Sequence, residues 1–121
     1  MLHHVGIEVA PADLERSVEF WQALGFTRVE PPATLSEFIW LEREETQIHL
    51  MPTERPSVPP RGHVAVVAPN FDAAVEALRE LGFEVEQRRE HWGSRRAGVI
   101  APGGHRVELM ATAPSAAKTQ D

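Results

Sequence analysis

Residues 104–110 (Gly-His-Arg-Val-Glu-Leu-Met) decide the fold, because part of this stretch occurs earlier in the chain as residues 46–51 (Thr-Gln-Ile-His-Leu-Met). When the two are superimposed with an offset of 59 residues, Glu108 falls on His49 and the two Leu-Met pairs coincide. A fixed offset of this kind is typical of one supersecondary unit used twice. The sequence therefore predicts two similar modules.

A second pair of segments, residues 4–9 and residues 63–68, has the same offset and superimposes His4 on His63. Two equivalent positions of the repeat therefore carry four side chains able to bind a metal ion: His4, His49, His63 and Glu108. Three imidazoles and one carboxylate suit a divalent ion and leave positions open for substrate or water. The repeat thus predicts one metal site.

Length and composition limit the class of protein. A chain of 121 residues fits one domain with its own core, and a net charge of −6 without a basic stripe argues against a nucleic-acid partner. The absence of cysteine excludes a thiolate nucleophile, a disulfide framework and a cysteine-based zinc site. No apolar run approaches the roughly 20 residues of a membrane helix, so we expect no membrane partner and a cytoplasmic location.

The first module is predicted over residues 2–51. Polarity alternates with a period of two over residues 2–9, which indicates a half-buried strand. Apolar residues at helical spacing follow and end at Gly25, a helix stop signal. Three further strands are expected at residues 26–30, 37–42 and 47–51.

The second module is predicted over residues 62–111, after a connector at residues 52–61 that contains four prolines. A strand at 63–68 and a helix ending at Gly82 repeat the first module, and strands are expected at 83–87, 96–101 and 105–110. We therefore predict an α+β fold in which two tandem β-α-β-β-β modules form a curved-sheet cup. They make one domain, residues 1–112, followed by a flexible tail, residues 113–121.

Side chains alternate across a strand, so each sheet has one apolar face for its helix and one opposite face. All four candidate ligands share the parity of the opposite, concave face, whereas His3 is expected to point the other way. Two modules facing each other would bring the four ligands together. We expect this arrangement to hold one divalent ion per site.

The chain resembles the vicinal oxygen chelate superfamily, which includes glyoxalase I, bleomycin-resistance proteins, fosfomycin-resistance enzymes, methylmalonyl-CoA epimerase and extradiol dioxygenases. The resemblance covers residues 2–111. The stretches that carry it are residues 4–7 (His-Val-Gly-Ile), 20–21 (Phe-Trp), 24–26 (Leu-Gly-Phe), 62–65 (Gly-His-Val-Ala) and 102–109 (Pro-Gly-Gly-His-Arg-Val-Glu-Leu). It implies the glyoxalase/bleomycin-resistance/dioxygenase fold and a homodimer with two sites, in which modules pair within a chain or are exchanged between chains.

The family pattern places metal ligands at the positions of His4, His49, His63 and Glu108. Several family enzymes have Glu or Gln where this chain has His49, so a glyoxalase-type site with two carboxylates is disfavoured. A second interpretation stays open, in which His4, His63 and Glu108 bind the metal and His49 is a nearby acid/base. The metal could be Fe, Zn, Ni, Mn or Co.

Two functions remain open at this point. One is a metal-dependent enzyme, an isomerase, lyase or dioxygenase, acting on a small oxygenated substrate that chelates the metal, with Glu108 or His49 moving the proton. The other is a binding protein that sequesters a drug without turnover, as bleomycin-resistance proteins do. The candidate substrate-binding residues are Phe38, Trp40, Gln47, Trp92 and Arg106.

Overall fold

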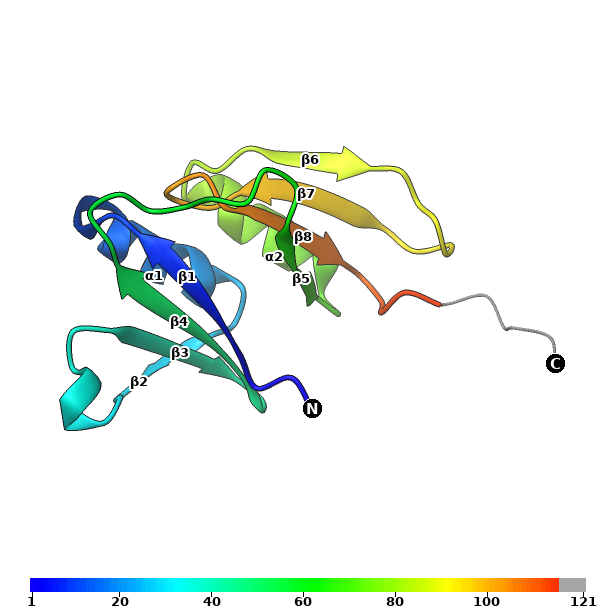
Figure 1. Ribbon diagram of the computed structural model, residues 1–121. Helices are drawn as coiled ribbons and strands as arrows, with labels where there is room; N and C mark the ends of the chain where they lie inside the picture. Colours follow the sequence, from blue (N-terminus) through cyan, green and yellow to red (C-terminus); the bar gives the residue numbers. More distant parts are fainter. Residues whose placement is uncertain (116–121) are drawn as a thin grey trace, which may run out of the picture.

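The computed structural model describes residues 1–115, and it contains two β-α-β-β-β modules (Figure 1). The first module consists of β1 (His4–Val9), the 3-10 turn η1 (Pro11–Asp13), α1 (Leu14–Ala23), β2 (Thr27–Val29), the 3-10 turn η2 (Ala33–Leu35), β3 (Ile39–Arg43) and β4 (Thr46–Pro52). The second consists of β5 (His63–Val67), α2 (Phe71–Glu80), β6 (Val85–Arg88), β7 (Arg96–Ile100) and β8 (Arg106–Met110). The predicted α+β fold is confirmed, with strand ends shifted by one or two residues.

Two further predictions concern the C-terminal tail and the absence of a membrane-spanning helix. Of the predicted flexible tail, residues 116–121 lie outside the described residues. Across residues 1–115, none of the helices has the length and apolar character needed to cross a membrane.

Each module forms one four-stranded sheet, and the strand orders β1-β4-β3-β2 and β5-β8-β7-β6 are the same. The first and last strands of a module pair in parallel, so that Gly6 lies beside His49 and Ala65 beside Glu108. A parallel pair needs a crossover connection, and here that connection includes the helix. The helix therefore covers one face of its own sheet and leaves the opposite face open.

The core lies between the helices and the sheets. On the sheet side it contains the strand residues whose parity was predicted to be apolar, among them Ile48, Leu50, Val107 and Leu109, all nearly inaccessible. The helices contribute Phe20 and Trp21 of α1 and Phe71, Val75 and Leu78 of α2. One continuous cluster joins the two modules.

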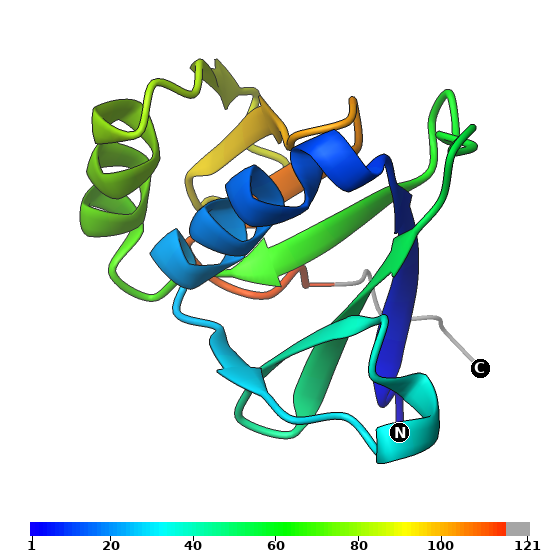
Figure 2. The same ribbon diagram turned by 90° about the vertical axis from the view of Figure 1, so that its left-hand side faces the viewer.

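The modules meet through their helices, which lie side by side (Figure 2). Phe20 of α1 contacts Phe83 with ring centroids 5.1 Å apart, and the Arg16 guanidinium lies 4.4 Å from the centroid of the same ring. Arg16 also donates a hydrogen bond to the carbonyl of Leu81, just after α2. Because the helices form the junction, residues on the concave faces stay exposed, His4 and Gly6 on the first sheet and His63 and Ala65 on the second.

A second junction ties β1 to the connector and to the start of β8. The backbone carbonyl of Glu8 accepts a hydrogen bond of 2.7 Å from His105 Nε2, and its carboxylate accepts one of 2.8 Å from the amide of Ser57. One contact is to the backbone of Glu8 and the other is to its side chain. They hold the modules and the connector in one arrangement.

Glycine ends both helices in a conformation that other residues adopt only with strain. Gly25 has φ +90° and Gly82 has φ +92°. A Cβ on Gly82 would meet only ordinary contacts, the nearest being Arg16 at 3.6 Å. The requirement for glycine at position 82 therefore comes from the backbone and not from crowding.

We predict that Gly82→Ala lowers the free energy of unfolding by about 1–2 kcal/mol, the cost of a left-handed conformation for an L-residue. Gly82→Asn should lose less, because asparagine tolerates this conformation. Chemical denaturation at one fixed protein concentration measures both. Equal stability of the alanine variant and the wild type would contradict this account of the helix stop.

Candidate functional site

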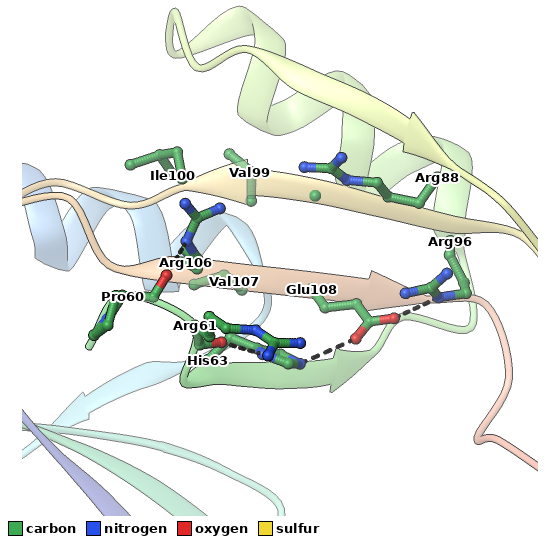
Figure 3. Close-up of a pocket in the computed structure, with 11 residues that line it drawn as sticks. Pro60, Arg61, His63, Arg88, Arg96, Val99, Ile100, Arg106, Val107 and Glu108 are labelled. Atoms are coloured by element: carbon green, nitrogen blue, oxygen red, sulfur yellow. Dashed lines mark hydrogen bonds and ion pairs between the residues drawn. The ribbon is translucent and has the colours of Figure 1, made fainter. Parts of the chain in front are cut away.

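On the second sheet, His63 of β5 and Glu108 of β8 face each other across a gap (Figure 3). His63 Nδ1 lies 3.0 Å from the carbonyl oxygen of Arg61, which can only accept, so Nδ1 carries the proton. In the neutral ring the lone pair is then on Nε2, 3.4 Å from Glu108 Oε2. We call these two residues the second half-site.

Arg96 of β7 holds the carboxylate of the second half-site. Its Nε donates to Glu108 Oε1 at 2.5 Å, and its Nη1 donates to the carbonyl of Arg89 at 2.6 Å. Both side chains of the ion pair are largely buried, at 18% exposure for Arg96 and 16% for Glu108. One carboxylate oxygen is thus fixed by the arginine, and the other is turned to His63.

Arg96 is not among the site residues predicted from the sequence. The parity of its strand contained a signal, because Arg96 shares a face with Gly98, which lies directly opposite Glu108 in the β7–β8 pair. The two strands were predicted at residues 96–101 and 105–110, only three residues apart, so the approximate register could have been derived.

On the first sheet, three rings form a stack. His49 of β4 lies parallel to His4 of β1, with ring centroids 3.9 Å apart, and parallel to Trp40 of β3 on its other side, at 4.1 Å. His49 is buried, whereas His4 is exposed. We call His4 and His49 the first half-site.

Two polar side chains orient His49. Gln47 Nε2 donates to Glu42 Oε1 at 2.9 Å, which leaves the amide oxygen of Gln47 to accept from His49 Nε2 at 2.7 Å. His49 Nδ1 is then the nitrogen with the lone pair. Such an outer hydrogen bond is the usual means of fixing the tautomer of a metal-binding histidine.

Burial lowers the pKa of His49 below its ordinary value, and the neighbouring His4 and His3 rings lower that pKa further. The neutral ring, which is the form that binds a metal, is favoured as a result. The expectation that His3 points away was wrong, since its Nδ1 lies 2.9 Å from His4 Nδ1. β1 begins at His4, so strand alternation does not extend to His3.

The structure brings the four candidate ligands together in two pairs. Within residues 1–115 of one chain, no three or more His, Asp or Glu side chains are grouped so that they could share a metal ion. One chain therefore offers two half-sites on two separate sheets. A site with all four ligands stays a prediction, and it requires another chain or a rearrangement of the modules.

Three predicted substrate-binding residues lie on or beside the first sheet. Trp40 stacks on His49, and Gln47 orients the same ring. Phe38, just before β3, is half-buried. The structure thus places Trp40 and Gln47 in contact with a candidate ligand.

The other two belong to the second module. Arg106 lines a cavity of about 460 Å³ together with His63 and Glu108 (Figure 3). Trp92 lies beyond this cavity, where its indole Nε1 donates to the carbonyl of Thr112 at 3.2 Å and its ring is 5.4 Å from the Arg96 guanidinium. Trp92 therefore contacts the half-site only through Arg96.

Similar folds occur among solved structures. They include the fosfomycin resistance protein FosX from Listeria monocytogenes (TM-score 0.75, 21% identity, 93% of this chain and 91% of that chain) and the oxidase ChaP-H2 (0.72, 19%, 93% and 94%). TnmS3, an antibiotic binding protein from Streptomyces sp. CB03234, is similar with a TM-score of 0.68 and 18% identity over 91% and 93% of the two chains.

These likenesses establish the fold alone. The comparison with curated proteins found no match. A family model matches residues 1–109, and the chain therefore belongs to the Glyoxalase/Bleomycin resistance protein/Dioxygenase superfamily.

Proposed function

We propose that this protein is a metal-dependent enzyme acting on a small oxygenated molecule that chelates a divalent metal ion. The observation that carries the proposal is the second half-site, where Nε2 of His63 and a carboxylate oxygen of Glu108 lie 3.4 Å apart beside an open cavity. An imidazole nitrogen and a carboxylate oxygen this close share a proton or bind a common metal cation. One nitrogen and one oxygen ligand suit a divalent transition metal.

The proposed site is completed by the first half-site of a second copy of the chain. Two protein ligands are fewer than the three or four that such metals commonly have. A twofold dimer in which the first sheet of one copy faces the second sheet of the other would make two identical four-ligand sites. The exposed concave faces of both sheets are available for this contact.

A bound metal would act as a Lewis acid that polarises a substrate oxygen and stabilises negative charge on it. Glu108 takes up the substrate's proton and returns it, because Arg96 holds one carboxylate oxygen and the other faces the cavity. His49, kept neutral by burial, is the second candidate acceptor. Four protein ligands leave about two of six positions, enough for a bidentate substrate, so we favour isomerase or lyase chemistry over dioxygenation.

The second candidate function is sequestration of an aromatic drug without turnover. The stack of His4, His49 and Trp40 favours it, because the outer face of the exposed His4 ring at the end of the stack can bind an aromatic ligand. TnmS3, which has a similar fold, is an antibiotic binding protein. Metal content separates the two functions, since only the enzyme requires a stoichiometric ion.

We predict that the untagged wild-type protein holds about one divalent ion per chain and that His63→Ala and Glu108→Ala each remove it. Elemental analysis after purification without chelators measures the content, and circular dichroism checks the fold. Arg28→Gln, a change on exposed β2, is the matched control and should keep the metal. Normal metal in His63→Ala would refute the ligand assignment.

The role of His49 has a separate test. If His49 is the fourth ligand, His49→Ala weakens metal affinity about tenfold or more, equivalent to about 1.4 kcal/mol. If His49 is only an acid or base, the affinity is kept and turnover alone is slowed. A metal titration of His49→Ala with unchanged affinity would exclude the four-ligand site and favour the three-ligand, dioxygenase-like site.

The dimer is tested by hydrodynamics. We predict a species of about 27 kDa, twice the chain mass of 13.5 kDa, because one chain carries only half-sites. Sedimentation equilibrium over a range of concentrations, with and without metal, measures the mass. A monomer at every concentration would contradict the shared site.

A further inference from the structure

The cavity at the second half-site carries a concentration of positive charge. Four arginines line it, Arg61, Arg88, Arg96 and Arg106, and the only carboxylate among its lining residues is Glu108, which Arg96 already binds. The whole chain has a net charge of −6. This local excess of guanidinium groups therefore does not follow from the composition.

The Arg88 guanidinium lies over Gly98, and both residues line the cavity. A Cβ on Gly98 would be only 2.7 Å from Arg88 Nε and 3.0 Å from its Nη2, closer than a methyl group allows. The equivalent position of the first module holds Trp40, because Trp40 is paired with His49 as Gly98 is paired with Glu108. The missing side chain at position 98 is what lets the guanidinium lie on the sheet.

Arg106 approaches the same place from β8. Its Nε donates to the carbonyl of Pro60 at 3.0 Å, which anchors the side chain. Within residues 1–115 its Nη atoms have no hydrogen-bond partner, and they point across the cavity towards β7 (Figure 3). An adjoining cavity of about 300 Å³ is also lined by Arg88, Gly98 and Arg106.

Carboxylates near this place neutralise little of the charge. Glu84 and Glu86 line the adjoining cavity, and Glu86 Oε2 lies 3.4 Å from Arg88 Nη2. That ion pair is exposed on both sides, with 49% of Arg88 and 68% of Glu86 accessible, so water and salt weaken it. Arg88 can exchange this partner for a ligand.

We propose that Arg88 and Arg106 bind an oxyanion in this cavity, and that the substrate of the proposed enzyme is therefore anionic. Guanidinium groups bind carboxylate, phosphonate and phosphate oxygens through paired charge-assisted hydrogen bonds. Gly98, over which the Arg88 guanidinium lies, is directly opposite Glu108, so the two strands place the guanidinium and the metal ligand about one strand spacing, roughly 5 Å, apart at the backbone. The inference rests on the proposed function and narrows the substrate to a small molecule that carries an anionic group in addition to its chelating oxygens.

The test is calorimetric titration of metal-free protein with methylphosphonate and with acetate at low ionic strength. We expect saturable binding of at least one, with Arg88→Gln and Arg106→Gln each weakening it about tenfold or more. Gly98→Ala should weaken it as well, without changing any charge, because the added methyl displaces Arg88. Tighter binding of methylphosphonate assigns a phosphonate or phosphate substrate, and tighter binding of acetate assigns a carboxylate.

Arg28→Gln, which removes one exposed positive charge from the other sheet, is the matched control and should bind both anions as the wild type does. The inference is overturned if the wild type binds neither anion, or if Arg88→Gln and Arg106→Gln bind the anion with wild-type affinity. It is also overturned if Arg28→Gln loses as much anion affinity as those two variants.

Metal content of the same variants separates this inference from the proposed function. If metal content is normal and anion affinity is unchanged in Arg88→Gln and Arg106→Gln, the anion site alone is refuted. Arginine-dependent anion binding in a protein that never takes up metal refutes the metal-dependent enzyme alone.

Discussion

The parallel pairing of the first and last strands of each module is the constraint on which the structure depends. It places His4 beside β4 and His63 beside β8, so one face of each sheet gathers two candidate ligands. The same pairing forces a crossover through a helix, which covers the other face. The core and the half-site therefore lie on opposite faces of each sheet. Both follow from the same strand pairing, which occurs once in each module.

The two half-sites show how one scaffold has acquired two kinds of chemistry. At equivalent positions the first sheet has His49, Trp40 and Gln47, whereas the second has Glu108, Gly98 and Arg106. The first side is aromatic and stacked, and the second is rich in charge and open. A ligand held between copies of the two would meet the ring stack on one side and guanidinium groups on the other.

The fold and the faces on which the candidate ligands lie could be predicted, because strand parity and the 59-residue repeat can be read directly from the order of the residues. They sorted Ile48, Leu50, Val107 and Leu109 into the core and the four candidate ligands onto the open faces. His3 was misplaced because the strand starts at His4, two residues later than predicted.

What could not be predicted depends on long side chains and on packing between modules. Arg88 and Arg96 reach across neighbouring strands, and no periodicity reveals where a guanidinium will rest. Arg88 also depends on the empty position at Gly98, which a sequence pattern shows only as a glycine in a strand. That the modules join through Arg16 and Phe20, and so leave their concave faces apart, is a tertiary property that the repeat does not encode.

The central claim, that each metal site combines half-sites from two chains, is tested most directly by complementation. A chain with His4→Ala and His49→Ala is unfolded and refolded together with an equal amount of a chain with His63→Ala and Glu108→Gln, and bound metal is measured. Each variant alone should hold none. Random assortment of twofold dimers should restore about a quarter of the wild-type metal, because half of the dimers are mixed and each mixed dimer has one intact site. No metal in the mixture, with mixed dimers shown to form, would contradict the account.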